Sequence, residues 1–364
     1  MNLKLIITGI CGFVGSTIAR TLINEPWVSS ICGIDNFSRR GSERNRKPFE
    51  DLGIRVVHGD IRCPSDVDCL PISDWVIDAA ANPSVLAGVD GKTSSRQLVE
   101  HNLLGTINLL EYCKAHQAGF CLLSTSRVYS MSALANLRMQ VVNGAFAPDP
   151  DQEFPAGISV RGISEAYSTA PPVSLYGSTK VNSEHLALEY GSTFGFPVWV
   201  NRCGVMAGAG QFGHPAQGIF AYWIHSFREK KQLKYIGFGG NGYQVRDCLH
   251  PRDLVHLLHK QLSSDRRSLD QATKSRSRIC NLSGGTANSI SLLNLSAWCE
   301  GRYGAMEILQ LPETRQFDIP WVVLNSSQAN REWDWTPSIR LEDILEEIAD
   351  FADREAEWLS LSTS

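Results

Sequence analysis

The sequence predicts an α/β protein, a doubly wound parallel sheet followed by a smaller α/β lobe at the C-terminal end. Two observations predict this class. Short apolar runs alternate with helical patterns through the first half of the chain, and a glycine-rich turn joins the first run to the first helix. Because the runs are apolar throughout, both faces of the sheet should be covered, unlike those of an antiparallel sandwich. The predicted strands are Leu3–Thr8, Ser30–Asp35, Arg55–His58, Trp75–Ala79, Phe120–Ser124 and Val198–Asn201.

The turn after the first strand has the spacing GxxGxxG and leads into a helix predicted over 16–24. Glycines there allow a tight turn and let a diphosphate approach the free N–H groups at the start of the helix, while the last glycine lets helix and strand pack closely. The turn therefore predicts a Rossmann-type dinucleotide site. Its candidate residues are Gly9, Gly12, Phe13, Val14 and Gly15.

An acidic residue ends the second strand. Asp35 lies twenty residues after Gly15, where a carboxylate can accept hydrogen bonds from ribose hydroxyls and repel a 2′-phosphate. We expect NAD rather than NADP, although Arg39 and Arg40 could partly offset the negative charge. Further candidate cofactor residues are Asn36, Asp60, Ile61, Ala79, Ala80 and Asn102, together with Tyr176 and Lys180.

A second motif, Tyr176-Gly-Ser-Thr-Lys180, places a phenol and an ammonium on one face of a helix. We expect the ammonium to lower the phenol pKa, so that Tyr176 can exchange a proton with a sugar hydroxyl. Thr125 follows the fifth predicted strand, at the sheet edge where open α/β sheets bind ligands. Thr125, Tyr176 and Lys180 are the candidate catalytic residues.

Composition excludes several classes of protein. The 364 residues are 43% hydrophobic and 20% charged, with a formal net charge of −4, so the chain has no overall basic field for nucleic acid. It lacks an apolar stretch of about 20 residues and an export signal, which predicts a cytoplasmic protein away from membranes. Ten cysteines without CxxC spacing predict reduced, buried thiols.

The regular alternation of strand and helix patterns ends at about residue 200, where glycine clusters and irregularly spaced apolar residues begin. We expect an NAD-binding domain over 1–200, with returning segments at about 232–262, and a predominantly substrate-binding lobe over 201–364. Apolar residues at helical spacing over 341–352 predict an amphipathic helix that docks on this lobe. Histidines at 250, 256 and 259 lack further ligands around them, so we expect no metal site.

The glycine turn, the Ser-Thr-x-x-Val-Tyr segment around Thr125 and the YxxxK motif resemble the extended short-chain dehydrogenase/reductase superfamily acting on nucleotide sugars. The resemblance includes Asn102 in an Asn-x-x-Gly-Thr helix and Arg246 in an Arg-Asp-x-x-His strand. It implies resident NAD, a nucleotide-diphosphate sugar substrate and assembly as a dimer or tetramer. It also implies that Arg246 contacts the diphosphate of the sugar nucleotide.

Within the superfamily, segments at 35–41, 240–247, 284–293 and 333–337 resemble the group of CDP-paratose 2-epimerases, also called CDP-tyvelose 2-epimerases. This resemblance implies tightly bound NAD and inversion at C2 of a CDP-3,6-dideoxyhexose through a 2-keto sugar. It also implies that Arg315 is a second diphosphate contact.

Departures from the superfamily pattern narrow the reaction. Dehydratases carry Asp-Glu after the Thr, and here Ser126-Arg127 stand there, so dehydration lacks its acid and base. Asp78 stands where the superfamily usually has His, and Val205 where Asn is common. The divergent segment 130–170 is expected to cover the sugar pocket.

Two alternatives stay open at this point. One is a 4-epimerase or a dehydrogenase of another UDP-, dTDP- or CDP-sugar. The other is an NAD-sensing binding protein without catalysis.

Overall fold

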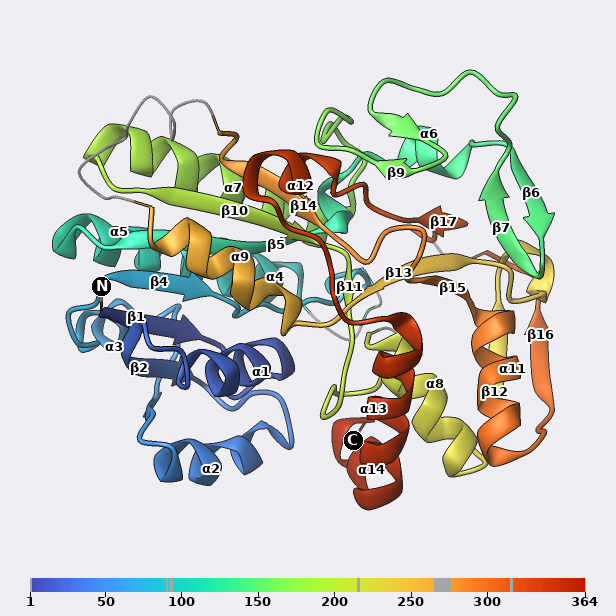
Figure 1. Cartoon of the computed structure of the whole chain (residues 1–364), viewed down its shortest axis with the longest axis horizontal. Coiled ribbons are helices and arrows are strands. Elements are labelled where there is room, and N and C mark those ends of the chain that lie inside the picture. The colour runs from blue at the N-terminus through green and yellow to red at the C-terminus, as the bar shows by residue number, and fades with distance from the viewer. Residues whose placement is uncertain are drawn as a thin grey trace.

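The computed structural model describes residues 2–89, 91, 94–214, 217–264, 276–314 and 317–363. A seven-stranded parallel sheet occupies one side of the molecule and several small sheets the other (Figure 1). This is the doubly wound Rossmann-like architecture with a smaller C-terminal part, as the sequence predicts. In sheet order the strands are β14 (Ile279–Leu282), β10 (Val198–Cys203), β5 (Gly119–Thr125), β4 (Trp75–Asp78), β1 (Leu3–Thr8), β2 (Val28–Asp35) and β3 (Arg55–His58).

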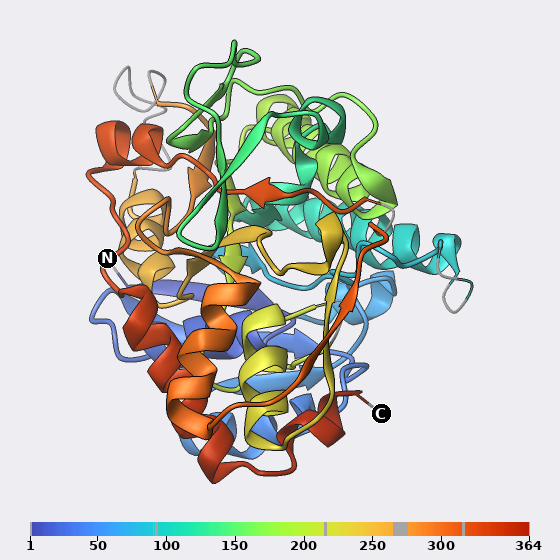
Figure 2. The ribbon, with the colours of Figure 1, turned by 90° about the vertical axis from the view of Figure 1, so that its right-hand side faces the viewer.

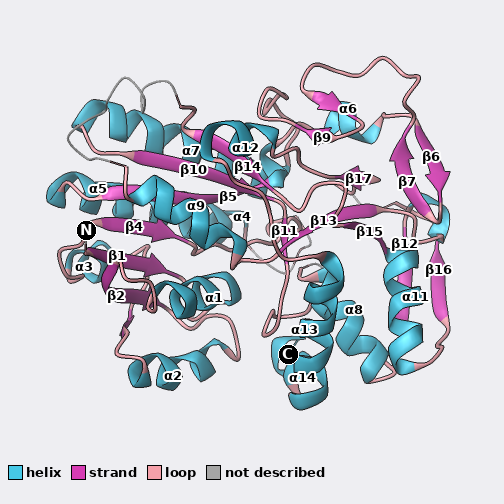
Figure 3. Ribbon diagram, in the orientation of Figure 1, coloured by secondary structure: helices cyan, strands magenta, loops and turns pink. Residues whose placement is uncertain are grey.

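Side chains alternate between the two faces of this sheet. Leu5 and Ile7 of β1 belong to one core cluster, whereas Ile6 between them belongs to another. Helices cover both faces (Figure 3), which explains why the strands read as unbroken apolar runs. The first cluster contains residues of α1 (Phe13–Leu22), α2 (Arg46–Asp51), α9 (Asp253–Leu262) and α12 (Ser327–Trp333). The second contains residues of α3 (Pro64–Asp68), α5 (Gly105–His116) and α7 (Ser174–Phe194).

The six predicted strands are all present, and β14 is a seventh that the sequence analysis missed. The helix that contains Asn102 begins before it, because α4 (Ser95–Val99) and a π-helical segment, η2 (Glu100–Leu104), lead directly into α5. Short 3-10 turns occur at η1 (Ser42–Asn45), η3 (Ser126–Val128) and η4 (Phe238–Gly240).

The small sheets lie beyond the carboxyl ends of the large one. In one of them β13 (Val245–Leu249) pairs with β11 (Val205–Met206), β15 (Ser289–Ser291) and β17 (Trp321–Val322). The remaining pairs are β12 (Leu233–Ile236) with β16 (Ile308–Leu311), β6 (Met139–Val142) with β7 (Ala145–Pro148), and β8 (Ile158–Ser159) with β9 (Gly162–Ile163). Over 232–262, therefore, β12 and β13 belong to small sheets and α9 packs on the large sheet, while the domain limits themselves stay a prediction.

The predicted C-terminal amphipathic helix is α13 (Leu341–Arg354). Its buried apolar side chains pack with α8 (Ile219–Arg228) and α11 (Leu292–Tyr303), and the three helices lie side by side in Figures 1 and 2. Two further helices are α6 (Met131–Ala135) and α14 (Trp358–Thr363). Within the described ranges, no helix combines the length and apolar character needed to cross a membrane. All ten cysteines are free thiols, and eight of them are buried.

Candidate active site

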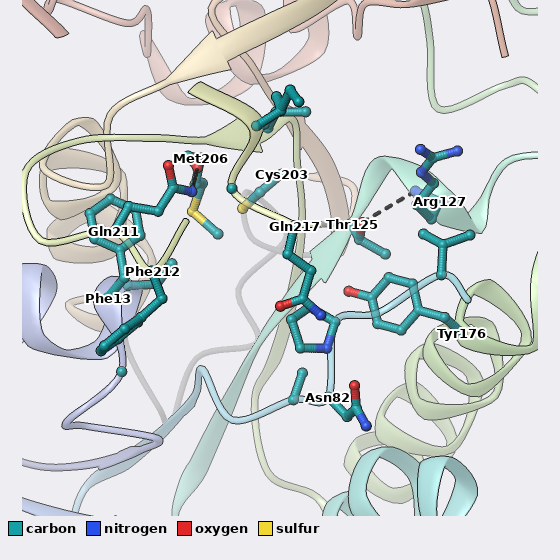
Figure 4. A pocket seen from close by; sticks show the side chains of 18 of the residues that line it. Phe13, Asn82, Thr125, Arg127, Tyr176, Cys203, Met206, Gln211, Phe212 and Gln217 are labelled. Atoms are coloured by element: carbon teal, nitrogen blue, oxygen red, sulfur yellow. Dashed lines mark hydrogen bonds between the residues drawn. The ribbon is translucent and has the colours of Figure 1, made fainter. Parts of the chain in front are cut away.

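A cleft of about 1040 Å³ lies at the carboxyl edge of the large sheet, between that sheet and the small ones. The ends of β1, β2, β4, β5 and β10 all contribute to its lining, as expected for a parallel open sheet. Its volume is at the upper end for ligand pockets, which suits two ligands bound together. Figure 4 shows Tyr176 and Thr125 on one side of this cleft and Phe13 and Phe212 on the other.

The glycine turn leaves room for a diphosphate only because side chains are missing. Gly9 has a φ of +59°, and a Cβ on Gly15 would stand 2.3 Å from the carbonyl oxygen of Gly9. Gly12 is the N-cap of α1, and neither a capping side chain nor an acidic residue occupies the first turn. Phe13 and Val14 of this turn also line the cleft. The free N–H groups of α1 thus fit the diphosphate of a dinucleotide.

Asp35 stands at the end of β2, 9% exposed, in the cleft wall. Its two oxygens accept hydrogen bonds from the N–H groups of Cys11 (2.9 Å) and Phe37 (2.8 Å). Burial raises the pKa of Asp35, and these hydrogen bonds oppose the shift. The carboxylate is therefore held rigidly beside the glycine turn, where a ribose would meet it.

A polar group continues the wall beyond Asp35. Asn36 donates to Asp60 at 3.0 Å, and Arg62 binds both oxygens of Asp60, whose pKa these hydrogen bonds and the positive charge hold well below its usual range. Ile61 follows in the same wall. The structure thus brings Asn36, Asp60 and Ile61, three of the candidate cofactor residues, together beside Asp35.

The end of β4 is organised by a buried hydroxyl. Thr8 donates to Asp78 at 2.6 Å and accepts from the N–H groups of Ala79 (3.1 Å) and Ala80 (3.0 Å). Thr8, itself held by Asp78, thereby fixes the turn at which Ala79 and Ala80 line the cleft.

Asn102 lies elsewhere. Its buried amide accepts from the N–H of Asn82 (2.8 Å) and donates to Thr179 (3.1 Å), and it is not among the lining residues of the cleft. The hydrogen bonds of its side chain are thus made to Asn82 and Thr179. Its contribution to a cofactor site is the positioning of Asn82, which does line the cleft.

Tyr176 projects from the first turn of α7 toward Thr125 (Figure 4). Burial raises the pKa of Tyr176 to about 12, while a hydrogen bond with Thr125 and the charge of Arg127 oppose the rise. Thr125 also accepts a hydrogen bond from the N–H of Arg127 at 3.2 Å. The phenol and the hydroxyl are therefore placed to share one substrate oxygen.

The expectation that Lys180 lowers the phenol pKa is wrong for the protein by itself. Lys180 is buried, and the opposite charge that acts on it most strongly is Asp78, followed by Glu184. The cation that acts on Tyr176 is Arg127. Both side chains of the motif line the cleft, but the ammonium of Lys180 interacts with the carboxylate of Asp78 on β4 and not with the phenol.

On the substrate side, Arg246 of β13 donates to Asp318 at 2.8 Å, and both line the cleft. Val205 lines it as well. Arg315 lies outside the described residues. Three further residues line the cleft that the sequence did not predict as site residues, Arg127, Asp318 and Gln244. The Oε1 atom of Gln244 is buried and has no hydrogen-bond partner in the described part of the chain. The sole signal for Arg127 was its place two residues after Thr125.

The segment 130–170 does not cover the sugar pocket, contrary to expectation. None of the lining residues comes from it. Its apolar side chains instead pack with Trp321, Val322 and Leu324 in a separate cluster beside β17. The divergent segment therefore builds the periphery of the small sheets.

These features agree with comparisons to known proteins. A model of the NAD dependent epimerase/dehydratase family matches residues 5–272. The chain belongs to this family. It is 29% identical to CDP-paratose 2-epimerase of Salmonella typhi over 96% of this chain and 99% of that enzyme. It is 24% identical to UDP-glucuronate 4-epimerase 2 of Arabidopsis thaliana, over 95% and 75% of the two chains.

Solved structures share the fold. Pal from Bacillus thuringiensis has a TM-score of 0.75 at 23% identity, covering 96% of this chain and 99% of its own. UDP-glucuronic acid 4-epimerase from Bacillus cereus, solved with UDP-glucuronic acid and NAD, has a TM-score of 0.72 at 22% identity and the same coverage. The protein is thus an NAD-dependent enzyme of the nucleotide-sugar epimerase/dehydratase family.

Proposed function

We propose that the protein is an epimerase that inverts C2 of a CDP-linked 3,6-dideoxyhexose and retains its NAD between turnovers. The observation that carries the proposal is the pair Thr125 and Tyr176 in one cleft with Arg127, not a carboxylate, beside them. Dehydration needs an acid and a base next to the Thr. This cleft offers a proton exchanger for a hydroxyl and a guanidinium, which supports epimerisation. The full-length similarity to CDP-paratose 2-epimerase supports C2 and CDP.

The chain's own residues supply binding and proton transfer. Gly9, Gly12 and Gly15 admit the cofactor diphosphate, and Asp35 holds the adenosine ribose. When bound, NAD⁺ supplies the redox chemistry, taking two electrons and a hydrogen from the sugar carbon and returning them.

Tyr176 removes the proton from the sugar hydroxyl as the carbonyl forms and returns it when the carbonyl is reduced. Thr125 hydrogen-bonds the same oxygen and keeps it in place. Lys180, a buried cation one turn along α7 that also lines the cleft, would hold the nicotinamide ribose of the cofactor. The keto sugar must turn over within the cleft before reduction, so that the opposite face receives the hydrogen.

The test is proton NMR of CDP-paratose incubated with the purified protein in D₂O, without added NAD, and with UDP- and dTDP-hexoses in parallel. Inversion at C2 without deuterium at C2 supports the proposal, because the hydrogen returns from the resident cofactor. Inversion at C4 of a UDP-sugar would replace it with a 4-epimerase, an alternative favoured by the similarity to UDP-glucuronate 4-epimerase 2. Accumulating NADH would indicate a dehydrogenase.

A variant separates catalysis from binding. Tyr176→Phe removes the proton exchanger and should abolish turnover while NAD remains bound, whereas unchanged turnover would refute the role of Tyr176. If both the wild-type protein and the variant bind NAD and convert none of the sugars, the protein is an NAD-binding protein without catalysis.

We also propose a dimer or tetramer. Val99, Leu104 and Leu175 are each at least 40% exposed on the helices that cover one face of the large sheet, and apolar side chains gathered on helices favour pairing. Light scattering at micromolar concentration measures the mass; a monomer of 40.2 kDa would refute the proposal.

A further inference from the structure

Arg127 is a charged side chain of the cleft that the reaction described above leaves without a role. It follows the catalytic candidate Thr125 by two residues, in the turn η3 that packs directly against α7. A Cβ on Gly177 would stand 2.3 Å from the carbonyl oxygen of Arg127. The backbone of Arg127 is therefore fixed relative to Tyr176, its neighbour in the cleft wall.

The guanidinium of Arg127 points to the substrate side of the cleft. Its Nη1 donates to the carbonyl oxygen of Phe317 at 3.3 Å, and the next residue, Asp318, accepts from Arg246 at 2.8 Å. In Figure 4 the Arg127 side chain extends away from the hydroxyl of Tyr176. Arg127 thus links the catalytic pair to the place where Arg246 is expected to hold the substrate diphosphate.

Among the described residues, no carboxylate is hydrogen-bonded to Arg127. Arg246 pairs with Asp318 and lies near the buried carboxylate of Asp247, whereas the guanidinium of Arg127 donates to the carbonyl oxygen of Phe317. Burial, with the nearby charge of Arg246, lowers the pKa of Arg127 to about 10, and Asp318 only partly opposes this. A guanidinium that lines the cleft and donates to a carbonyl oxygen, not to a carboxylate, favours an anion with several oxygens.

The chemistry of the sugar limits which anion can reach it. A CDP-3,6-dideoxyhexose has no charge except on its diphosphate, which is attached through the anomeric carbon, C1. C2 is bonded to C1, whereas C4 lies across the ring. A cation next to Thr125 and Tyr176 can therefore meet the sugar-linked phosphate when C2 faces the phenol.

We infer that Arg127 binds the phosphate attached to the sugar and thereby holds C2, rather than C4, against Thr125 and Tyr176. The inference rests on the proposed function, because it names the contact that selects the carbon. Arg127 is then a substrate-binding residue that determines specificity, and Arg246 serves the same diphosphate from β13.

The test compares binding of CDP with binding of CMP by calorimetry, using the NAD-containing protein. CDP carries the second phosphate and CMP does not, so the CDP-to-CMP ratio of their association constants isolates contacts to that phosphate. A charged hydrogen bond of this kind is worth about tenfold or more in affinity. Arg127→Gln should weaken CDP binding about tenfold and leave CMP binding unchanged. The pair UDP and UMP is measured in the same way.

Two variants complete the design. Arg138→Gln is the matched control, because Arg138 is exposed and pairs with Asp149 away from the cleft. Arg127→Lys keeps the charge without the planar donors, so CDP affinity should fall by less than in Arg127→Gln. Retained NAD and an unchanged melting temperature confirm that each variant is folded, and if Arg127→Gln fails this check, the Lys variant decides.

The outcomes separate the two claims. An unchanged CDP-to-CMP ratio in Arg127→Gln overturns the inference, even if the wild-type protein inverts C2. A reduced ratio in a protein that inverts only C4 supports the phosphate contact but refutes both its link to C2 and the proposed function. A reduced ratio with inversion at C2, accompanied by a raised KM for the CDP-sugar, supports both.

Discussion

A buried ion pair behind the catalytic candidates gives the sharpest stability prediction. Glu184, on α7 one turn after Lys180, is fully buried, and Arg202 on β10 is 6% exposed. Arg202 binds both carboxylate oxygens of Glu184, with its Nε 3.1 Å from each and its Nη2 at 2.6 Å. Glu184 also accepts from Ser124, the residue before Thr125. The pair therefore ties α7 to the ends of β5 and β10.

The perturbation is Glu184→Gln, which keeps the shape of the side chain and removes its charge. Arg202 would then be a buried cation without its counter-ion, a situation that costs about 3–5 kcal/mol. Arg202→Met should cost about as much, because it leaves the Glu184 charge alone. The double variant Glu184→Met with Arg202→Met should recover most of the loss, since an apolar pair needs no compensation.

The assay is urea unfolding followed by both circular dichroism and tryptophan fluorescence, so that coincidence of the two transitions can be checked. The control is Asp51→Asn, which breaks an exposed pair with Lys47 and should cost less than about 1 kcal/mol. Loss of the buried pair should also lower kcat, because α7 carries Tyr176 and Lys180. A cost below about 1 kcal/mol for Glu184→Gln, or a double variant as unstable as the sum of the singles, would refute the reasoning.

Three further predictions follow from other parts of the structure. Asp35→Ser removes the carboxylate that faces the ribose and leaves Arg39 in the same wall, so NADP affinity relative to NAD should rise about tenfold or more in a fluorescence titration; an unchanged ratio contradicts the assignment. Gly15→Ala places a methyl group 2.3 Å from a backbone oxygen, so calorimetry should show lost NAD binding and a cost of about 1–3 kcal/mol. Burial lowers the pKa of His225 from 6.5 to about 4, so the unfolded chain binds the proton first as the pH falls. Stability should then decline below about pH 6.5, by about 2 kcal/mol between pH 7 and pH 5, and His225→Phe should abolish this decline in urea titrations.

The sequence alone determined the parts of the protein that depend on local geometry. The glycine turn, Asp35 at the end of β2 and Thr125 at the end of β5 could be located because strand ends meet at one edge of a parallel sheet. Tyr176 and Lys180 share a helix face because they are four residues apart.

Only the tertiary structure decided which charges face one another. Lys180 interacts with Asp78 from a distant strand, Arg127 reaches Phe317 across 190 residues, and Arg246 reaches Asp318 across 72. No local pattern encodes such pairs, because they arise from how the sheets and helices pack. Spacing along the chain predicts which side chains share a face, whereas the direction of a pKa shift depends on the burial and the neighbours that packing creates. For that reason the sequence predicted the catalytic candidates, and the fold revealed that Arg127 is the cation beside Tyr176.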